Sequence, residues 1–118
     1  MIELKTDTNG VVRVSDEVII VIAGTAAFEI EGVVGIGGHC LNNLNDKSVR
    51  KHMMRGIKLK IEGSEIKLSM IISVKYGSKI PDVSIKVQER VKTAIETMTG
   101  LNVKTVYVIV GALVNKKA

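Results

Sequence analysis

Aromatic residues are scarce in this sequence. There is no tryptophan, one phenylalanine (Phe28) and two tyrosines (Tyr76 and Tyr107). Each of the three lies in an apolar stretch, so we expect all of them in the core. Binding of single-stranded nucleic acid without sequence preference normally stacks bases on exposed aromatic rings. The sequence therefore argues against nucleic acid as the main partner.

Cysteine is almost absent as well. Cys40 is the single cysteine, so no disulfide forms within the chain. The first residues have neither the basic start nor the apolar stretch of a secretion signal. The longest apolar or small run, Val18 to Phe28, is about half of the ~20 residues that a membrane span needs. We expect a cytoplasmic protein without a membrane span.

Motifs for catalysis or metal binding are missing too. His39-Cys40 is the single adjacent pair of a base and a nucleophile, and no Gly-x-Ser-x-Gly motif accompanies it. The set His39, Cys40 and His52 lacks the spacing of known zinc sites. We therefore predict a chain that is not an enzyme and that binds no cofactor and no metal.

The chain has the length and the apolar content of one domain. Its 118 residues are 46% hydrophobic, and no Pro- or Gly-rich linker divides them. We predict a single domain over residues 1–118, with its core at about 10–111.

Two helices are predicted. Ser15 offers a capping hydroxyl, and the following run to Phe28 is too long and too rich in alanine for an average strand. The second helix begins near Pro81 and ends at Gly100. Its apolar residues recur at helical spacing and define a core face: Val83, Val87, Val91, Ile95 and Met98.

Strands are predicted around these helices. They comprise a short strand at Val11–Val14, an irregular one in the glycine-rich stretch 32–38, a hairpin and a last strand from Leu101 to Val110. The hairpin alternates apolar and polar residues on both sides of Gly63-Ser64, a pair that suits a type II′ turn. Residues 39–55 are predicted to be a loop or a short basic helix. The order gives a two-layer α+β domain, a mixed sheet with two main helices packed on one face.

Positive charge is concentrated in one segment. The chain has a formal net charge of +5, and no acidic residue lies between Lys47 and Lys60. We predict that this segment docks on an acidic protein or an anionic lipid surface, and an ordinary solvated surface is the alternative. Its basic residues are Lys47, Arg50, Lys51, Arg55, Lys58 and Lys60.

The last predicted strand is apolar on both faces. Such a strand is either covered on both sides or used in an interface. We predict self-association through Val106, Val108 and Val110.

The glycine cluster allows a different function. Gly32-Val-Val-Gly35 follows a predicted helix and resembles the Gly-x-x-Gly loop with which KH domains clamp nucleic acid. Val33 and Val34 bring no positive charge to a phosphate, however. A KH-like nucleic-acid module that uses Gly32 to Gly35 and the basic segment 47–60 is therefore the alternative prediction.

Three stretches together resemble the alkaline shock protein family of Gram-positive bacteria, also called the envelope stress response family. Their order and spacing carry the resemblance, which spans nearly the whole chain from Gly10 to Gly111. The stretches are Val14-Ser-Asp-Glu-Val-Ile19 running into Glu31-Gly-Val-Val-Gly35, then Tyr76-Gly77 with Ile80-Pro81, and then Met98-Thr-Gly-Leu101 with Val110-Gly111.

The resemblance implies a non-catalytic interaction or scaffold protein of the cell envelope. In the founding branch of the family the domain self-associates and is held at the membrane by a separate anchor protein. With few residues outside Gly10–Gly111, the chain is more similar to a short branch whose genes neighbour a fatty-acid kinase. The expected partner is thus a membrane-associated protein or an enzyme of fatty-acid metabolism.

Overall fold

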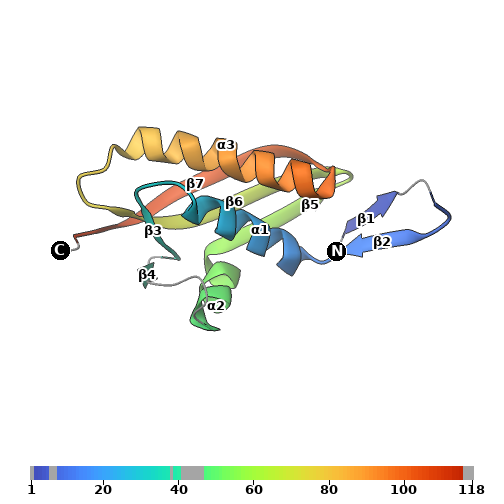
Figure 1. Cartoon of the computed structure of the whole chain (residues 1–118), viewed down its shortest axis with the longest axis horizontal. Coiled ribbons are helices and arrows are strands. Elements are labelled where there is room, and N and C mark those ends of the chain that lie inside the picture. Colours follow the sequence, from blue (N-terminus) through green and yellow to red (C-terminus); the bar gives the residue numbers. More distant parts are fainter. Residues whose placement is uncertain (1, 6–7, 38, 41–46, 116–118) are drawn as a thin grey trace.

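The computed structural model describes residues 2–5, 8–37, 39–40 and 47–115. Three helices and seven strands are formed by these residues (Figure 1). In chain order they are β1 (Ile2–Lys5), β2 (Val11–Val14), α1 (Asp16–Phe28), β3 (Val33–Ile36), β4 (His39–Cys40), α2 (Lys47–Gly56), β5 (Ile57–Glu62), β6 (Glu65–Lys75), α3 (Ile80–Thr99) and β7 (Asn102–Val114).

β6 is the central strand of the main sheet. Along one side it pairs antiparallel with β5 and then with β3, which in turn pairs with β4. Along its other side it pairs with β7, and this pairing is parallel. The predicted mixed sheet is confirmed.

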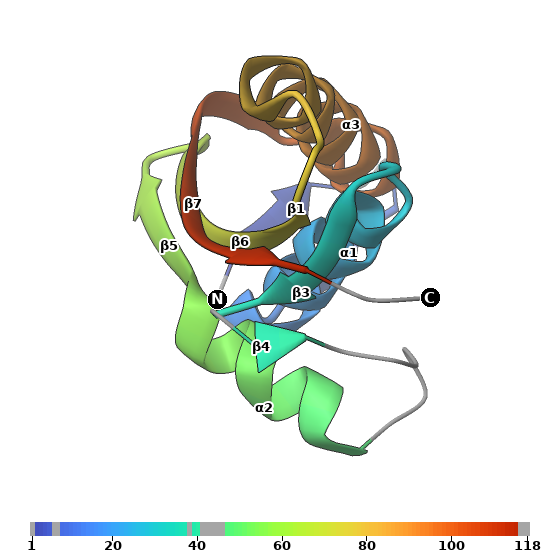
Figure 2. The same cartoon turned by 90° about the vertical axis from the view of Figure 1, so that its left-hand side faces the viewer.

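The helices α1 and α3 cover one face of this sheet, as predicted (Figure 2). Burying the apolar side chains of that face stabilises the fold, because it removes them from water. The fully buried members are supplied by both layers and include Ile19, Ile36, Ile66, Leu68, Met70, Ile72, Val87, Val91 and Ile95.

Helix α1 begins where the sequence predicts. The hydroxyl of Ser15 accepts a hydrogen bond from the backbone N–H of Val18, and Asp16 and Glu17 occupy the first turn. The β-branched residues that follow would favour a strand by local propensity. Burial of Ile19, Ile20 and the alanines against the sheet outweighs that preference.

The end of helix α3 corrects one predicted core residue. Gly100 ends the helix with a φ of 73°, as predicted. Met98, however, is 69% exposed, and Thr99 is buried in its place. Thr99 follows Ile95 by four positions and therefore lies on the same face of the helix. Its hydroxyl donates to the C=O of Ile95 and accepts from the N–H of Leu101.

The β5–β6 hairpin has the predicted turn. Glu62 pairs with Glu65 across Gly63-Ser64, and the φ of Gly63 is 62°. No described residue other than glycine has a positive φ, so Ser64 takes the ordinary conformation that a type II′ turn requires.

Several elements go beyond the sequence-based expectation. Strands β1 and β4 were not predicted, and β7 continues past Val110 to Val114. β1 and β2 form a separate two-stranded sheet at one end of the molecule (Figure 1). Ile2 of β1 is nevertheless buried as part of the core cluster.

The prediction for two of the aromatic residues is wrong. Phe28 is partly buried and packs against the core, but Tyr76 is 65% exposed and Tyr107 is 67% exposed. Tyr76 follows the last residue of β6, where the covered part of the sheet ends. Tyr107 lies in β7, on the face opposite the helices. Both rings are thus available for contacts with other molecules.

Candidate functional site

The basic segment forms helix α2 and the start of β5. The helix is held by Val49 and Met53, which are buried in the core cluster. Met53 lies against Gly24 of α1, where a Cβ atom would come within 2.8 Å of its side chain. This packing directs Arg50, Lys51 and Arg55 outward, and all three are exposed. Lys58 and Lys60 of β5 are exposed as well.

Some of these charges are already paired. Arg50 forms an ion pair with Glu17 of α1. Lys60 lies 3.3 Å from a carboxylate oxygen of Glu62, and Lys67 approaches the same carboxylate at 3.4 Å. The hydrogen bond from Lys60 and the nearby charge of Lys67 hold the pKa of Glu62 below its ordinary value.

Three cations of the segment have no such pair. Lys51, Arg55 and Lys58 form no ion pair within the described residues, and the side chain of Lys47 lies outside the description. We call Lys51, Arg55 and Lys58 the basic surface. An unpaired, exposed cation is available to an acidic partner at low desolvation cost.

The second predicted surface is strand β7. From Val106 to Val114 half-buried and exposed residues alternate strictly. Val106, Val108 and Val110 are the half-buried ones, and their side chains pack against the core. The exposed ones include Tyr107 and Ile109, which lie on the face opposite the helices. Leu113 is exposed as well, but it follows the bulge at Gly111 and lies opposite the buried Val74. Self-association through Val106, Val108 and Val110 stays a prediction.

The outer edge of β7 was missed by sequence reasoning. Within the described residues β7 pairs with β6 alone. Two side chains of α3 reach this edge: Glu96 accepts from the N–H of Val103, and Gln88 donates to the C=O of Val106. The sequence carries no direct signal for this edge, because the place of a strand at the end of a sheet depends on which strands pair with it.

The glycine cluster does not form a KH-like loop. Gly32 is a turn residue with a φ of 103°, and Val33–Ile36 is strand β3. The backbone of β3 is engaged in pairing with β6, at Val33 with Val74 and at Gly35 with Ser73. It is therefore not free to clamp a phosphate backbone, and no observation favours the nucleic-acid alternative.

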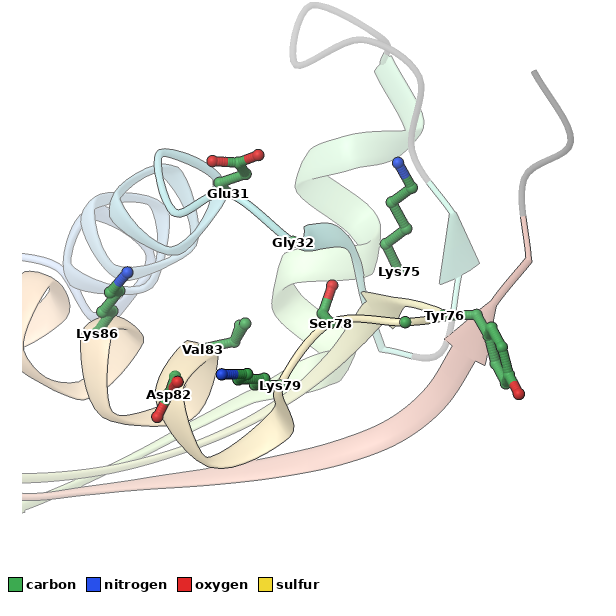
Figure 3. Close-up of a pocket in the computed structure, with 10 residues that line it drawn as sticks. Glu31, Gly32, Lys75, Tyr76, Ser78, Lys79, Asp82, Val83 and Lys86 are labelled. Carbon is green, nitrogen blue, oxygen red and sulfur yellow. The ribbon is translucent and has the colours of Figure 1, made fainter.

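A hollow of about 460 Å³ opens beside the first turn of α3 (Figure 3). Its charged side chains have both signs: Lys79, Asp82 and Lys86 come from the start of α3, and Glu31 and Lys75 come from neighbouring segments. Ser78 is its one hydroxyl-bearing aliphatic residue, and no histidine or cysteine is among the described lining residues. The lining therefore contains no Ser–His or Cys–His pair of the kind used in nucleophilic catalysis.

Metal binding and membrane insertion find no support in the part of the chain that the structure describes. No group of three or more His, Cys, Asp or Glu residues there could hold a metal ion. The side chains of His39 and Cys40 lie outside the description. No helix among these residues has the length and apolar character needed to cross a bilayer.

The fold and its surfaces define a two-layer α+β domain with a basic surface on α2 and β5 and an open sheet edge along β7. A family model matches residues 4–114, that of the alkaline shock protein 23 family, described as having a cell envelope-related function. The chain belongs to this family, which confirms the resemblance inferred from its motifs.

Proteins of Bacillus subtilis and Streptococcus pyogenes are similar in sequence. The uncharacterized protein YloU of B. subtilis is 35% identical over 111 residues, which cover 92% of both chains. A stress response regulator gls24 homolog of S. pyogenes is 26% identical over 102 residues, which are 86% of this chain and 57% of that protein.

Solved structures share the fold at low sequence identity. The MamM CTD in a variant described as its copper form matches with a TM-score of 0.52, at 18% identity, over 83% of this chain and 98% of that chain. A zinc form matches with a TM-score of 0.51, also at 18% identity, over 86% and 87%. At this identity the match shows the arrangement of helices and strands alone.

Proposed function

We propose that this chain is a non-catalytic interaction protein that binds a protein partner through the basic surface and also self-associates. It would serve as a scaffold in cell-envelope homeostasis or in fatty-acid metabolism. The partner is a membrane-associated protein, which would hold the chain at the cytoplasmic side of the membrane, or an enzyme of fatty-acid metabolism. No catalytic residue and no cofactor belong to this proposal.

The observation that carries the proposal is the basic surface. Its three side chains lie close in sequence on α2 and β5, they are exposed, and no described carboxylate neutralises them. Complementary charge speeds encounter and selects the partner more than it adds affinity. An acidic patch on the partner is therefore the expected counterpart.

Affinity purification from the native cell after crosslinking tests the proposal. The wild-type chain should recover an envelope protein or a fatty-acid-metabolism enzyme. The triple variant Lys51→Glu, Arg55→Glu and Lys58→Glu should recover much less of it. Arg50 is left unchanged because its ion pair with Glu17 also holds α2 against α1.

A matched control keeps the change in net charge the same. Lys86→Glu, Lys92→Glu and Lys104→Glu alter three exposed residues of α3 and β7 and should leave recovery unchanged. Equal losses in both triple variants would mean that total charge, not this surface, mediates binding. Recovery of RNA that nuclease removes would instead support the nucleic-acid alternative and reject this proposal.

A further inference from the structure

The outer edge of β7 contains a short stretch of backbone with free hydrogen-bonding groups. Alternate residues of a strand direct their N–H and C=O groups to opposite sides. On β6, the N–H of Lys75 donates to Gly32 and the C=O of Ile71 accepts from Gly37, so both residues face β3. The residues that alternate with these along β6, among them Met70 and Ile72, therefore direct their backbone groups to β7.

The residues of β7 that point away from β6 follow from this pairing. In a parallel pair, the residue opposite a bonded one directs its own N–H and C=O to the far side. Leu68, Met70 and Ile72 lie opposite Val106, Val108 and Val110. These three valines thus present their backbone groups to the open edge. The bond from Gln88 to the C=O of Val106 agrees with this direction.

The free stretch is bounded on both sides. At Val106 the edge is occupied by the side chain of Gln88. Beyond Val110 the register shifts, and Gly111 has no partner on β6. After this bulge the C=O of Val114 accepts a hydrogen bond from the N–H of Tyr76, the residue after β6. The next outward residue is therefore Leu113, which breaks the every-second-residue pattern of the valines. Val108 and Val110 remain, and Ile109 is the centre of the stretch.

We infer that this edge pairs with the same edge of a second copy, antiparallel about a two-fold axis at Ile109. Val108 of each copy would exchange hydrogen bonds with Val110 of the other. Because Val108 and Val110 lie symmetrically around Ile109, all of their free backbone N–H and C=O groups would find hydrogen-bond partners in this arrangement. The two main sheets would then form one continuous sheet.

The side chains of the edge suit this pairing. Ile109 of one copy would lie directly opposite Ile109 of the other. Tyr107 would lie opposite Gly111 of the other copy, which has no side chain to obstruct the ring. No charged residue occurs between Thr105 and Val114, so no like charges meet and none of the usual edge-protecting lysines is present.

The helical layers of both copies would lie on the same face of the continuous sheet. Ile85, one turn before Gln88 on α3, is 52% exposed. Because Gln88 overhangs the edge of β7, Ile85 would lie on the side of α3 that faces the partner's helix. A second apolar contact would thus accompany the strand pairing.

This inference rests on the proposed function, of which it specifies the self-association. The two are tested separately, because the basic surface and the edge of β7 share no residue. A purified chain with no partner present reports on the edge alone.

Disulfide trapping provides the experiment. In a Cys40→Ser background, Ile109→Cys places one thiol per chain at the proposed axis. Directly opposite residues of a non-hydrogen-bonded pair have Cα atoms ~4.5 Å apart, within the range that a disulfide bridges. Mild oxidation at millimolar protein concentration should give a disulfide-linked dimer.

Leu113→Cys in the same background is the matched control. Leu113 is 49% exposed, against 48% for Ile109, but it lies beyond the bulge at Gly111 and outside the free stretch. This variant should form a linked dimer at least about tenfold more slowly, because the two thiols at position 113 would not be neighbours in the paired dimer. Equal rates for the two variants, or no dimer from Ile109→Cys, would overturn the inference.

Sedimentation of variants without an introduced cysteine gives a second readout. Ile109→Lys places two like charges directly opposite each other and should raise the dimer dissociation constant at least about tenfold. Leu113→Lys should leave it nearly unchanged. Thermal unfolding of each variant verifies that it is folded. A strictly monomeric wild-type chain at the highest concentration would also reject the pairing.

Discussion

At the residue scale, Glu62 is the carboxylate whose environment is most clearly defined. It ends β5 beside the turn of the hairpin, and Lys60 and Lys67 both approach it. The hydrogen bond from Lys60 comes first among the causes that lower its pKa, followed by the charge of Lys67. Ionised Glu62 thus contributes stability above its ordinary pKa, and this contribution disappears as the pH falls through the lowered value.

We predict that an NMR titration of the Glu62 side chain gives a midpoint below the ordinary glutamate value. Replacing Lys60 by Met should raise that midpoint, because the donor of the hydrogen bond is lost. Lys67→Met should raise it less. A midpoint that neither substitution moves would show that the two lysines do not interact with Glu62 in solution.

At the element scale, the end of α3 depends on a buried hydroxyl. Thr99 bonds to Ile95 within the helix and to the N–H of Leu101 beyond it, so it joins α3 to the start of β7. The position of α3 relative to β7 matters for the outer edge of β7, because α3 also supplies Gln88 and Glu96 to that edge.

We predict that Thr99→Val lowers the free energy of unfolding by about 1–3 kcal/mol. Valine keeps the shape of threonine but leaves the buried N–H of Leu101 without its acceptor. Met98→Ala, one residue away, should cost less than about 0.5 kcal/mol, because Met98 is 69% exposed. Denaturant titrations measure both, and the reverse order would contradict the assigned burial.

At the scale of the whole molecule, the two proposed surfaces should respond differently to salt. The basic surface is exposed and charged, whereas the free stretch of β7 is uncharged. Screening shortens the reach of exposed charges from ~8 Å at 0.15 M ionic strength to ~3 Å at 1 M.

We therefore predict that added salt releases the protein partner but not the second copy. Recovery of the partner should fall steeply between about 0.15 M and 1 M NaCl, while trapping through Ile109→Cys should persist. Loss of trapping over the same range would indicate that charge, rather than strand pairing, brings two copies together.

The sequence alone determined most of the elements and several of their limits. Ser15, Gly63-Ser64 and Gly100 act on their immediate neighbours, so the start of α1, the hairpin turn and the end of α3 could be predicted from local chemistry. Helix α2 was predicted as one of two options for the basic segment. The family could also be inferred from the motifs, because their order and spacing can be read directly from the sequence.

Only the tertiary structure decided which side of each element is covered. Tyr107 lies in an apolar stretch, yet it is exposed because the helices cover the other face of β7. Arg50 is neutralised by Glu17, a residue far away in sequence, whereas Lys51 is not. The open edge at Val108 and Val110 depends on the pairing of β7 with β6 and on the reach of Gln88. These features arise from contacts between distant segments, and local sequence patterns carry no direct record of such contacts.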